Sequence, residues 1–438
     1  MKLIYELLIT IFLTCIITFI YQNQARTLIN NGKGYDGFYY YKICENIQKE
    51  KNPIVGEAPF INRVGTFWLI SNFSSYSKYN LLKSAEIVNY TGGFLTILLL
   101  VIWLRIYIKT YSVRLILTLL FCTCWFLPLR IVKFYPMTSD PWGAFWFLLG
   151  LIMLNLLFRA LNEHKNKLFY LFLFSIIVSI GTLFRESNII LAFSILFYDD
   201  PIRYKSIFKL NFVKNVIFKR SLLIKLFFVS ISVLFTITIK FLTNRYIEKS
   251  NFTNYSYLDS IVHWFYLKSL PQFLLGFFLA YGPIISILPF IKDNKTFLLK
   301  NQSLSFLLIC GFGLSYIGGS DTERILYYLT FPIILVLIGI SIKNLLLSNQ
   351  KWYLILILIL QTIAYRLFWL TPDFEYNNKI HILAFFNLIG NKFPHLFLYS
   401  QHGNIILNTI LLIQYIFILF LSSYIIKNKI ELKTPFSK

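Results

Sequence analysis

Four short stretches of the sequence carry residue types that can move a proton or hold a phosphate. They are GYDGFYYYK (Asp36, Tyr39, Tyr40), YPMTSDPWG (Asp140), GTLFRESN (Arg185, Glu186) and GGSDTERILYYLTFP (Asp321, Glu323, Arg324). A carboxylate can accept a proton from an attacking hydroxyl group. A guanidinium can bind a phosphate through two parallel hydrogen bonds. Together the stretches could supply the groups needed for transfer from a phosphate ester.

Each stretch also has a structural interpretation, and the pattern leaves both open. Asp36 can cap the helix that follows it, with its carboxylate accepting backbone N–H bonds. Asp140 followed by Pro141 fits a helix start with Asp at the cap and Pro at the first position. Arg185 and Glu186 lie in a tight turn between two apolar runs, where they can simply pair with neighbours.

Arg324 is the member of the set that a cap does not explain. Asp321 and Glu323 suit the start of a helix, where negative charge is favourable. A cation in the first turn opposes the helix dipole, so Arg324 needs an anion. A phosphate is an apt anion, because the guanidinium fork matches its geometry.

The elements that position these residues are apolar helices. The chain has 438 residues, of which 57% are hydrophobic and 14% charged, and its mean hydropathy is +0.64. Soluble domains carry roughly 25% charged residues, and a helix needs about 20 apolar residues to cross a bilayer. We therefore expect an all-α polytopic membrane protein forming one domain over 1–438. About twelve spans are expected, near 3–21, 84–104, 112–129, 141–158, 168–184, 186–198, 222–242, 272–291, 301–317, 325–342, 352–370 and 405–426.

Basic residues set the expected orientation. The net charge of +23 would suggest nucleic acid in a soluble protein, but here most Lys and Arg fall in alternate short loops. Those loops, including the basic segment 199–221, are expected in the cytoplasm with both termini. The long loop 22–83 and all four acidic stretches then face the opposite, extracytoplasmic side. We expect anionic lipid headgroups, and no nucleic acid, to be the partners of the basic loops.

The loop 22–83 is expected to contain interfacial helices. Over residues 37–49 its apolar side chains recur at roughly helical spacing, which indicates an amphipathic helix lying in the membrane interface. Those side chains are Phe38, Tyr41, Ile43, Cys44 and Ile47.

These residues resemble the GT-C glycosyltransferases, which are membrane enzymes that take a sugar from a polyprenyl-phosphate donor. GYDGFYYYK is similar to the aromatic-Asp-Gly patch of their first outer loop. FRESNIILAFSILF resembles their Arg/Lys-Glu turn before a mid-chain span, and DTERILYYLTFPIIL resembles a late Arg-containing turn. No P-loop, kinase motif, GxSxG elbow or HExxH motif is present.

The resemblance implies roles for the residues. Asp36 would be the general base that deprotonates the acceptor hydroxyl, and Arg324 would hold the phosphate as it leaves with inversion at the sugar. The transferred sugar would be a hexose or a pentose. Metal-using members carry an Asp-x-Asp pair in the first loop; this sequence has none there, so nothing supports a divalent cation or another cofactor. The expected substrate-binding residues are Asp140, Arg185, Glu186, Asp321, Arg324, Tyr39 and Tyr40.

Two other classes stay open from the sequence. One is a lipid-linked polysaccharide polymerase or ligase, which would have longer basic outer loops late in the chain. The other is a lipid or sugar transporter, which would carry polar or broken spans near the middle of the bilayer. Because the ionisable residues lie at span ends, a transporter is disfavoured. The resemblance then implies a glycosyltransferase in a bacterial plasma membrane, acting on a glycan or glycolipid acceptor of the cell envelope.

Overall fold

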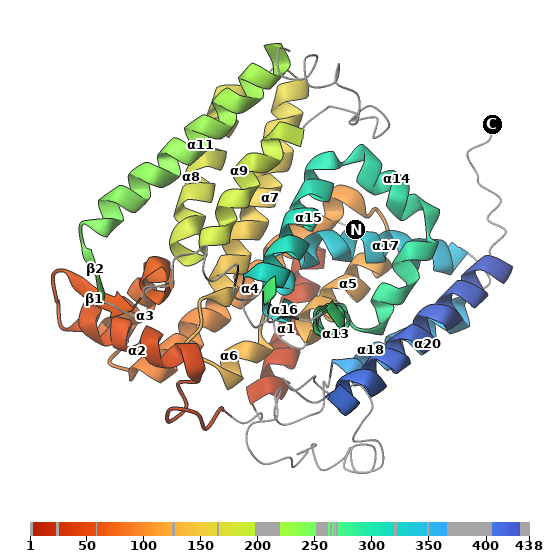
Figure 1. The fold of residues 1–438 in the computed structure, drawn as a ribbon, viewed down its shortest axis with the longest axis horizontal. Coiled ribbons are helices and arrows are strands. Elements are labelled where there is room, and N and C mark those ends of the chain that lie inside the picture. Colours follow the sequence, from red (N-terminus) through yellow and green to blue (C-terminus); the bar gives the residue numbers. More distant parts are fainter. Residues whose placement is uncertain are drawn as a thin grey trace.

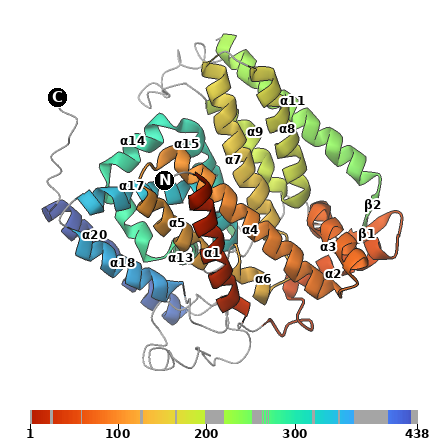
Figure 2. The ribbon, with the colours of Figure 1, turned by 180° about the vertical axis from the view of Figure 1, so that it is seen from behind.

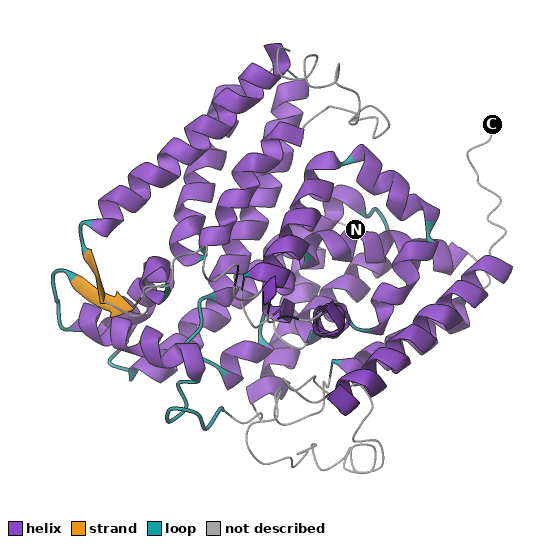
Figure 3. Cartoon of the chain, viewed as in Figure 1, coloured by secondary structure: helices purple, strands orange, loops and turns teal. Residues whose placement is uncertain are grey.

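The computed structural model describes residues 3–22, 26–57, 59–124, 128–163, 166–197, 220–250, 262, 265–266, 268, 270–318, 322–347, 350–365 and 405–429. Within these residues the chain is almost entirely helical, with one short two-stranded ladder (Figure 3).

The first half of the chain builds a group of long helices and the shorter α5. They are α1 (Leu3–Gln22), α4 (Leu81–Tyr107), α5 (Tyr111–Thr123), α7 (Asp140–Asn162), α8 (Lys167–Phe184) and α11 (Arg220–Asn244). α8 packs between α7 and α11, and α4 packs on α7 (Figure 1). From behind, α1 lies across α4 and α5 (Figure 2). The short helix α6 (Arg130–Phe134) leads into α7.

The second half is made of shorter and bent helices. They are α13 (Leu270–Tyr281), η5 (Pro283–Phe290), α14 (Lys292–Lys300), α15 (Gln302–Ile317), α16 (Thr322–Leu329), α17 (Phe331–Leu347), α18 (Lys351–Ala364) and α20 (Ile405–Lys429). α16 contacts α7, α13, α15 and α17, so it joins the two halves. The first turn of α16 carries Arg324.

The chain is a multi-pass membrane protein. Within its described residues, six helices are long and apolar enough to cross a membrane, and up to eight do so if each bent pair counts as one span. The bent pairs are α14 with α15, at 103°, and α16 with α17, at 72°. Helical segments occur in all twelve ranges expected from the sequence, but several are short or broken. The count of twelve therefore stays a prediction.

The loop between α1 and α4 folds into a small cap at one end of the helices (Figure 1). It contains α2 (Tyr35–Gln48), β1 (Ile54–Glu57), η1 (Phe60–Arg63) and α3 (Val64–Ser77). Its core buries Tyr40, Ile43 and Cys44 of α2 against Phe67 and Ile70 of α3. The amphipathic helix expected at 37–49 is thus present, although its buried face packs on protein.

A parallel ladder ties this cap to the end of α11. β1 pairs with β2 (Ile247–Ser250), and Val55 lies opposite Glu248. Because β2 follows α11 directly, the first loop and the end of α11 must lie on the same side of the membrane. The expected basic loop 199–221 falls almost wholly outside the described residues.

Candidate active site

Arg324 joins two of the acidic stretches through one guanidinium. Its Nη1 donates to Oδ2 of Asp36 at 3.0 Å, and its Nε donates to Oδ2 of Asp140 at 2.7 Å. Arg185 forms an ion pair with the other carboxylate oxygen of Asp140. Residues that lie 288 positions apart in the chain thus form one ion-pair network.

The place of Arg324 explains why it needs two anions. It lies in the first turn of α16, where the helix dipole is unfavourable for a cation. Its side chain is 14% exposed, so its charge must also be offset without much help from water. The sequence analysis favours a phosphate as the anion, whereas in this structure the two aspartates lie beside the guanidinium.

Asp140 is held rigidly at the start of α7. It is 1% exposed, and Thr138 donates its hydroxyl hydrogen to Oδ2 at 2.8 Å. The preceding loop is fixed by Asn89 of α4, which donates to the carbonyls of Pro136 and Thr138. The cap expected at Asp140 is wrong by one residue. Ser139 is the N-cap, and the Asp140 carboxylate is used for the arginines.

Asp36 occupies the first turn of α2 and is the more accessible acid. The N-cap of α2 is Gly34, and it makes no side-chain cap hydrogen bond, so the expected capping role of Asp36 is also wrong. Gly34 has a φ of 80°, and a Cβ there would lie 2.5 Å from the Tyr135 ring. The Asp36 side chain is 40% exposed, whereas Asp140 is closed off.

The arginines control the charge of Asp36. Burial alone would raise the pKa of its carboxyl, but the nearby charges of Arg324, then Arg63 and Arg185, hold the pKa below its ordinary value. Asp36 is consequently a charged, weakly basic carboxylate in this arrangement.

Arg63 is a member of the site that the sequence analysis did not single out. It lies at the end of η1, where its Nε donates to Oε2 of Glu186 at 3.2 Å and its Nη1 donates to the Tyr40 hydroxyl at 2.6 Å. Burial would lower the pKa of Arg63, but Tyr40 and Glu186 raise it. The available signal was an arginine inside the apolar stretch PFINRVGTFW.

Glu186 is positioned by the turn after α8, as expected from the sequence. It opens the short helix η2 (Glu186–Ile189), and its side chain is 24% exposed. Its carboxylate accepts the hydrogen bond from Nε of Arg63. Glu186 therefore keeps Arg63 beside Asp36.

Arg185 is enclosed by small and aromatic neighbours. Its guanidinium lies 5.3 Å from the centroid of the Tyr328 ring, and the Tyr328 hydroxyl bonds the Ser187 hydroxyl at 2.5 Å. A Cβ on Gly143 of α7 would lie 2.4 Å from Cγ of Arg185. Only glycine leaves room for this arginine to reach Asp140.

The comparisons with known proteins give the fold. The sequence matches no protein-family model, and it matches no curated protein sequence. Its structure resembles two solved structures of the Archaeoglobus fulgidus oligosaccharyltransferase. One holds a tethered acceptor peptide with the NVT sequon (TM-score 0.52, 15% identity, 91% of this chain and 59% of that chain). The other, AglB, is in complex with an inhibitory peptide and a dolichol-phosphate (TM-score 0.52, 15% identity, 96% and 56%).

The chain has the helical fold of these oligosaccharyltransferases. The likeness expected from the sequence is thereby confirmed for the fold. The chain spans less than 60% of the length of these oligosaccharyltransferases, so the two proteins share the helical part that the alignment covers.

The two expected tyrosines lie beside the ion pairs and pack on aromatic rings of the cap. Tyr39 stacks on Phe60, with ring centroids 4.7 Å apart, and Tyr40 is fully buried and stacks on Phe67 at 4.2 Å. Tyr40 therefore positions Arg63. Asp321 lies outside the described residues.

The positive charge between Asp36 and Asp140 comes from arginine. Among the residues that the structure describes, no three His, Cys, Asp or Glu side chains are grouped to hold a metal ion. Arg324 fills the space between Asp36 and Asp140 where a shared cation would lie. The network can offer an exposed carboxylate beside guanidinium groups, which suits proton removal next to a bound anion.

Proposed function

We propose that the protein is a membrane glycosyltransferase that moves a sugar from a polyprenyl-phosphate donor to an acceptor hydroxyl group on the extracytoplasmic face. The observation that carries this proposal is Arg324, held between an accessible Asp36 and a buried Asp140. The GT-C fold supports it over a transporter, since one similar structure binds a dolichol-phosphate. The product would be a cell-envelope glycan or glycolipid.

The chemistry assigns one step to each group. The acceptor oxygen attacks the anomeric carbon of the sugar while Asp36 takes the hydroxyl proton. The bond from that carbon to the phosphate oxygen breaks, and the phosphate leaves with the electron pair and with inversion at the carbon. Arg324 stabilises the negative charge on the leaving oxygen, and it does so strongly because it is shielded from water. Either a hexose or a pentose fits this scheme.

Donor binding would also activate Asp36. The ion pairs contain three cations (Arg63, Arg185, Arg324) and three carboxylates (Asp36, Asp140, Glu186). A donor phosphate adds negative charge and competes for Arg324. Asp36 is the carboxylate that can yield, because it is exposed and Asp140 is not. Released from Arg324, Asp36 regains the higher pKa of a useful base.

The decisive experiment is a transfer assay on the protein purified in nanodiscs, with labelled polyprenyl-phosphate hexoses and pentoses as donors. For Asp36→Asn we expect kcat to fall by about 100-fold or more, since general base catalysis typically contributes 10²–10⁴-fold. Donor KM should change little, because the amide leaves Arg324 free for the phosphate.

The matched control is Asp293→Asn. Asp293 is an exposed aspartate on α14 that accepts a hydrogen bond from Asn344, away from the network. It should retain the activity of the parent protein. Full turnover by the Asp36→Asn protein would show that Asp36 is not the general base. Movement of the donor lipid across vesicle membranes, with no donor consumed, would contradict the proposed glycosyltransferase activity.

A further inference from the structure

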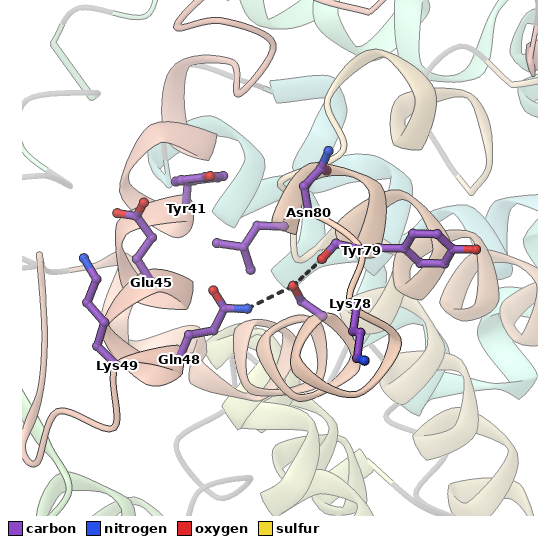
Figure 4. A pocket seen from close by; sticks show the side chains of 9 residues that line it. Tyr41, Glu45, Gln48, Lys49, Lys78, Tyr79 and Asn80 are labelled. Carbon is purple, nitrogen blue, oxygen red and sulfur yellow. Dashed lines mark hydrogen bonds between the residues drawn. The ribbon is translucent and has the colours of Figure 1, made fainter.

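A polar cavity lies on the cap, and none of the residues of the ion-pair network lines it. It has a volume of ≈ 380 Å³ and lies between α2 and the turn that joins α3 to α4 (Figure 4). Its lining residues are Tyr41, Glu45, Gln48, Lys49, Ser74, Lys78, Tyr79, Asn80 and Leu81.

The cavity is built by a helical stripe on α2. Tyr41, Glu45 and Gln48 recur every three to four residues, so they share one face of the helix. Gln48 donates to the Ser74 hydroxyl at 2.9 Å, and Ser74 donates to the Tyr79 carbonyl at 2.7 Å, which fixes the rim. The Tyr79 ring points away from the cavity in Figure 4.

The lining chemistry fits a neutral polyhydroxyl ligand better than an anion. Glu45 and Lys49 are one helical turn apart, so their charges offset each other. The third charged lining residue, Lys78, extends its side chain away from Tyr41, Glu45 and Gln48 (Figure 4). Gln48 and Asn80 add amide groups, which both donate and accept hydrogen bonds. Tyr41 adds a ring wall held by Lys33, whose Nζ lies 4.0 Å from the ring centroid. Sugar hydroxyl groups likewise donate and accept.

The cavity opens to water. Lys42, Gln48 and Lys49 on the outer side of α2 are exposed, and Lys51 follows them on the surface. Such a charged face is unsuited to the hydrocarbon of the membrane. A water-borne ligand can therefore reach the cavity.

We propose that this cavity binds a sugar unit of the acceptor glycan, which extends the glycosyltransferase function proposed above and rests on it. Glu45 follows Asp36 by nine residues on α2, which corresponds to about 13 Å along the helix axis. The cavity and Asp36 also lie on different faces of α2. A bound acceptor is then an oligosaccharide whose distal sugar unit lies in the cavity.

Saturation-transfer NMR on the Asp36→Asn protein in nanodiscs tests binding without turnover. The probes are methyl glycosides of glucose, galactose, mannose and N-acetylglucosamine, with maltotriose and chitotriose. We expect saturation transfer to at least one probe, and at least a fivefold loss of its affinity on Tyr41→Ala. Glu45→Gln, which keeps the side-chain size, should weaken the same probe at least twofold.

The matched control is Tyr76→Ala, because this tyrosine of α3 is 90% exposed and does not line the cavity. It should leave affinity within twofold of the parent. The proposal is overturned if no probe gives a signal, if the two tyrosine variants behave alike, or if only dihexanoyl phosphatidylglycerol binds, which would identify a lipid headgroup site.

The transfer assay separates this proposal from the proposed function. If transfer to an oligosaccharide acceptor occurs and Tyr41→Ala leaves acceptor KM unchanged, the cavity has no role and the function stands. If saccharide binding depends on Tyr41 but no donor is consumed, the cavity is a saccharide site and the proposed transferase function is contradicted. If the cavity binds the acceptor and the protein transfers sugar, Tyr41→Ala should raise acceptor KM about fivefold and leave kcat unchanged. This pattern is expected when the lost contact stabilises the ground state and the transition state equally.

Discussion

One guanidinium serves two carboxylates that differ in access to water. Asp140 is closed in by Thr138 and Arg185, so it can only anchor Arg324. Asp36 is 40% exposed and shares the same arginine. This asymmetry assigns the anchoring role to Asp140 and leaves Asp36 to meet a substrate.

The lowered pKa of Asp36 gives a prediction for pH dependence. A carboxylate with a lowered pKa keeps its charge, and the stability of its ion pair, until the pH falls through that lowered value. The profile of kcat/KM reports the free enzyme, so it should stay flat down to about pH 4, near the ordinary aspartate pKa. The profile of kcat reports the donor complex, in which Arg324 contacts phosphate.

We therefore expect the acidic limb of kcat to lie at higher pH than that of kcat/KM. Initial rates over a range of donor concentrations, from pH 4 to pH 8, measure both profiles. If the acidic limbs of kcat and kcat/KM lay at the same pH, the donor phosphate would not have replaced Asp36 as the partner of Arg324. The limb of kcat should vanish in Asp36→Asn, whose residual rate has no base to titrate.

Several site residues could be predicted from the sequence because their types are costly in apolar surroundings. Asp36, Asp140, Arg185, Glu186 and Arg324 stand out for that reason, and the structure brings them together. What the sequence could not show is the pairing. The helix caps expected at Asp36 and Asp140 are local alternatives, and partners more than 100 positions away outcompete them.

At the scale of elements, each network residue lies at the end of a helix. Asp36 and Arg324 lie in the first turns of α2 and α16. Asp140 is the first residue of α7, and Arg185 follows the last residue of α8. Helix ends are stiff because packing fixes the helices behind them. Side chains mounted there can hold a phosphate and a base at a fixed separation, as catalysis requires.

Gly143 gives a prediction about the packing of α7 against Arg185. Alanine favours a helix over glycine by about 1 kcal/mol, so Gly143→Ala should help α7 locally. Its Cβ would, however, lie 2.4 Å from Cγ of Arg185 and force this side chain away from Asp140. We expect kcat/KM for the donor to fall by at least tenfold in the transfer assay.

The control for this substitution is Gly313→Ala in α15. A Cβ there would meet nothing within 4 Å, so the added methyl group has room. It should keep full activity and the same or a higher thermal midpoint. Equal activity of the two alanine variants would show that Arg185 does not need its present place.

The long apolar helices follow directly from run length, whereas the breaks do not. α1, α4, α7, α8 and α11 occur where uninterrupted apolar runs were found. The bends of 103° and 72° in the second half were not predicted, because hydropathy reports the length of an apolar run and not the angle between its helices. Arg63 escaped notice for a similar reason, since its partners Tyr40 and Glu186 are defined only by the fold.

At the scale of the whole molecule, the two ends of the helices are chemically different. The ion-pair network lies where α7 begins. The opposite ends of α4 and α7 carry Arg105 and Arg159. There Glu6 of α1 is held by Arg105 at 2.6 Å and by Arg114 of α5 at 2.6 Å. Arg105 and Arg159 belong to the basic loops that are expected in the cytoplasm, so the orientation stays a prediction.

This polarity gives a prediction for membrane topology. In a chain whose five cysteines are replaced by serine, Tyr76→Cys should react with an impermeant maleimide added to intact cells. Tyr76 is 90% exposed on the cap. Asp293→Cys, exposed on α14, should react only after the cells are opened. Labelling of both sites from outside would refute the expected orientation.

The parallel ladder of β1 and β2 has a consequence for the synthesis of the chain. Residues 58–246 must be made after β1 before β2 exists, which takes roughly 10–40 s at about 5–20 residues per second. During that interval the cap lacks its partner strand. The ion pair between Asp36 and Arg324 forms later still, because Arg324 is made after β2. A nascent chain stalled before residue 247 should therefore carry a cap that proteases cut, and release past residue 324 should make it resistant.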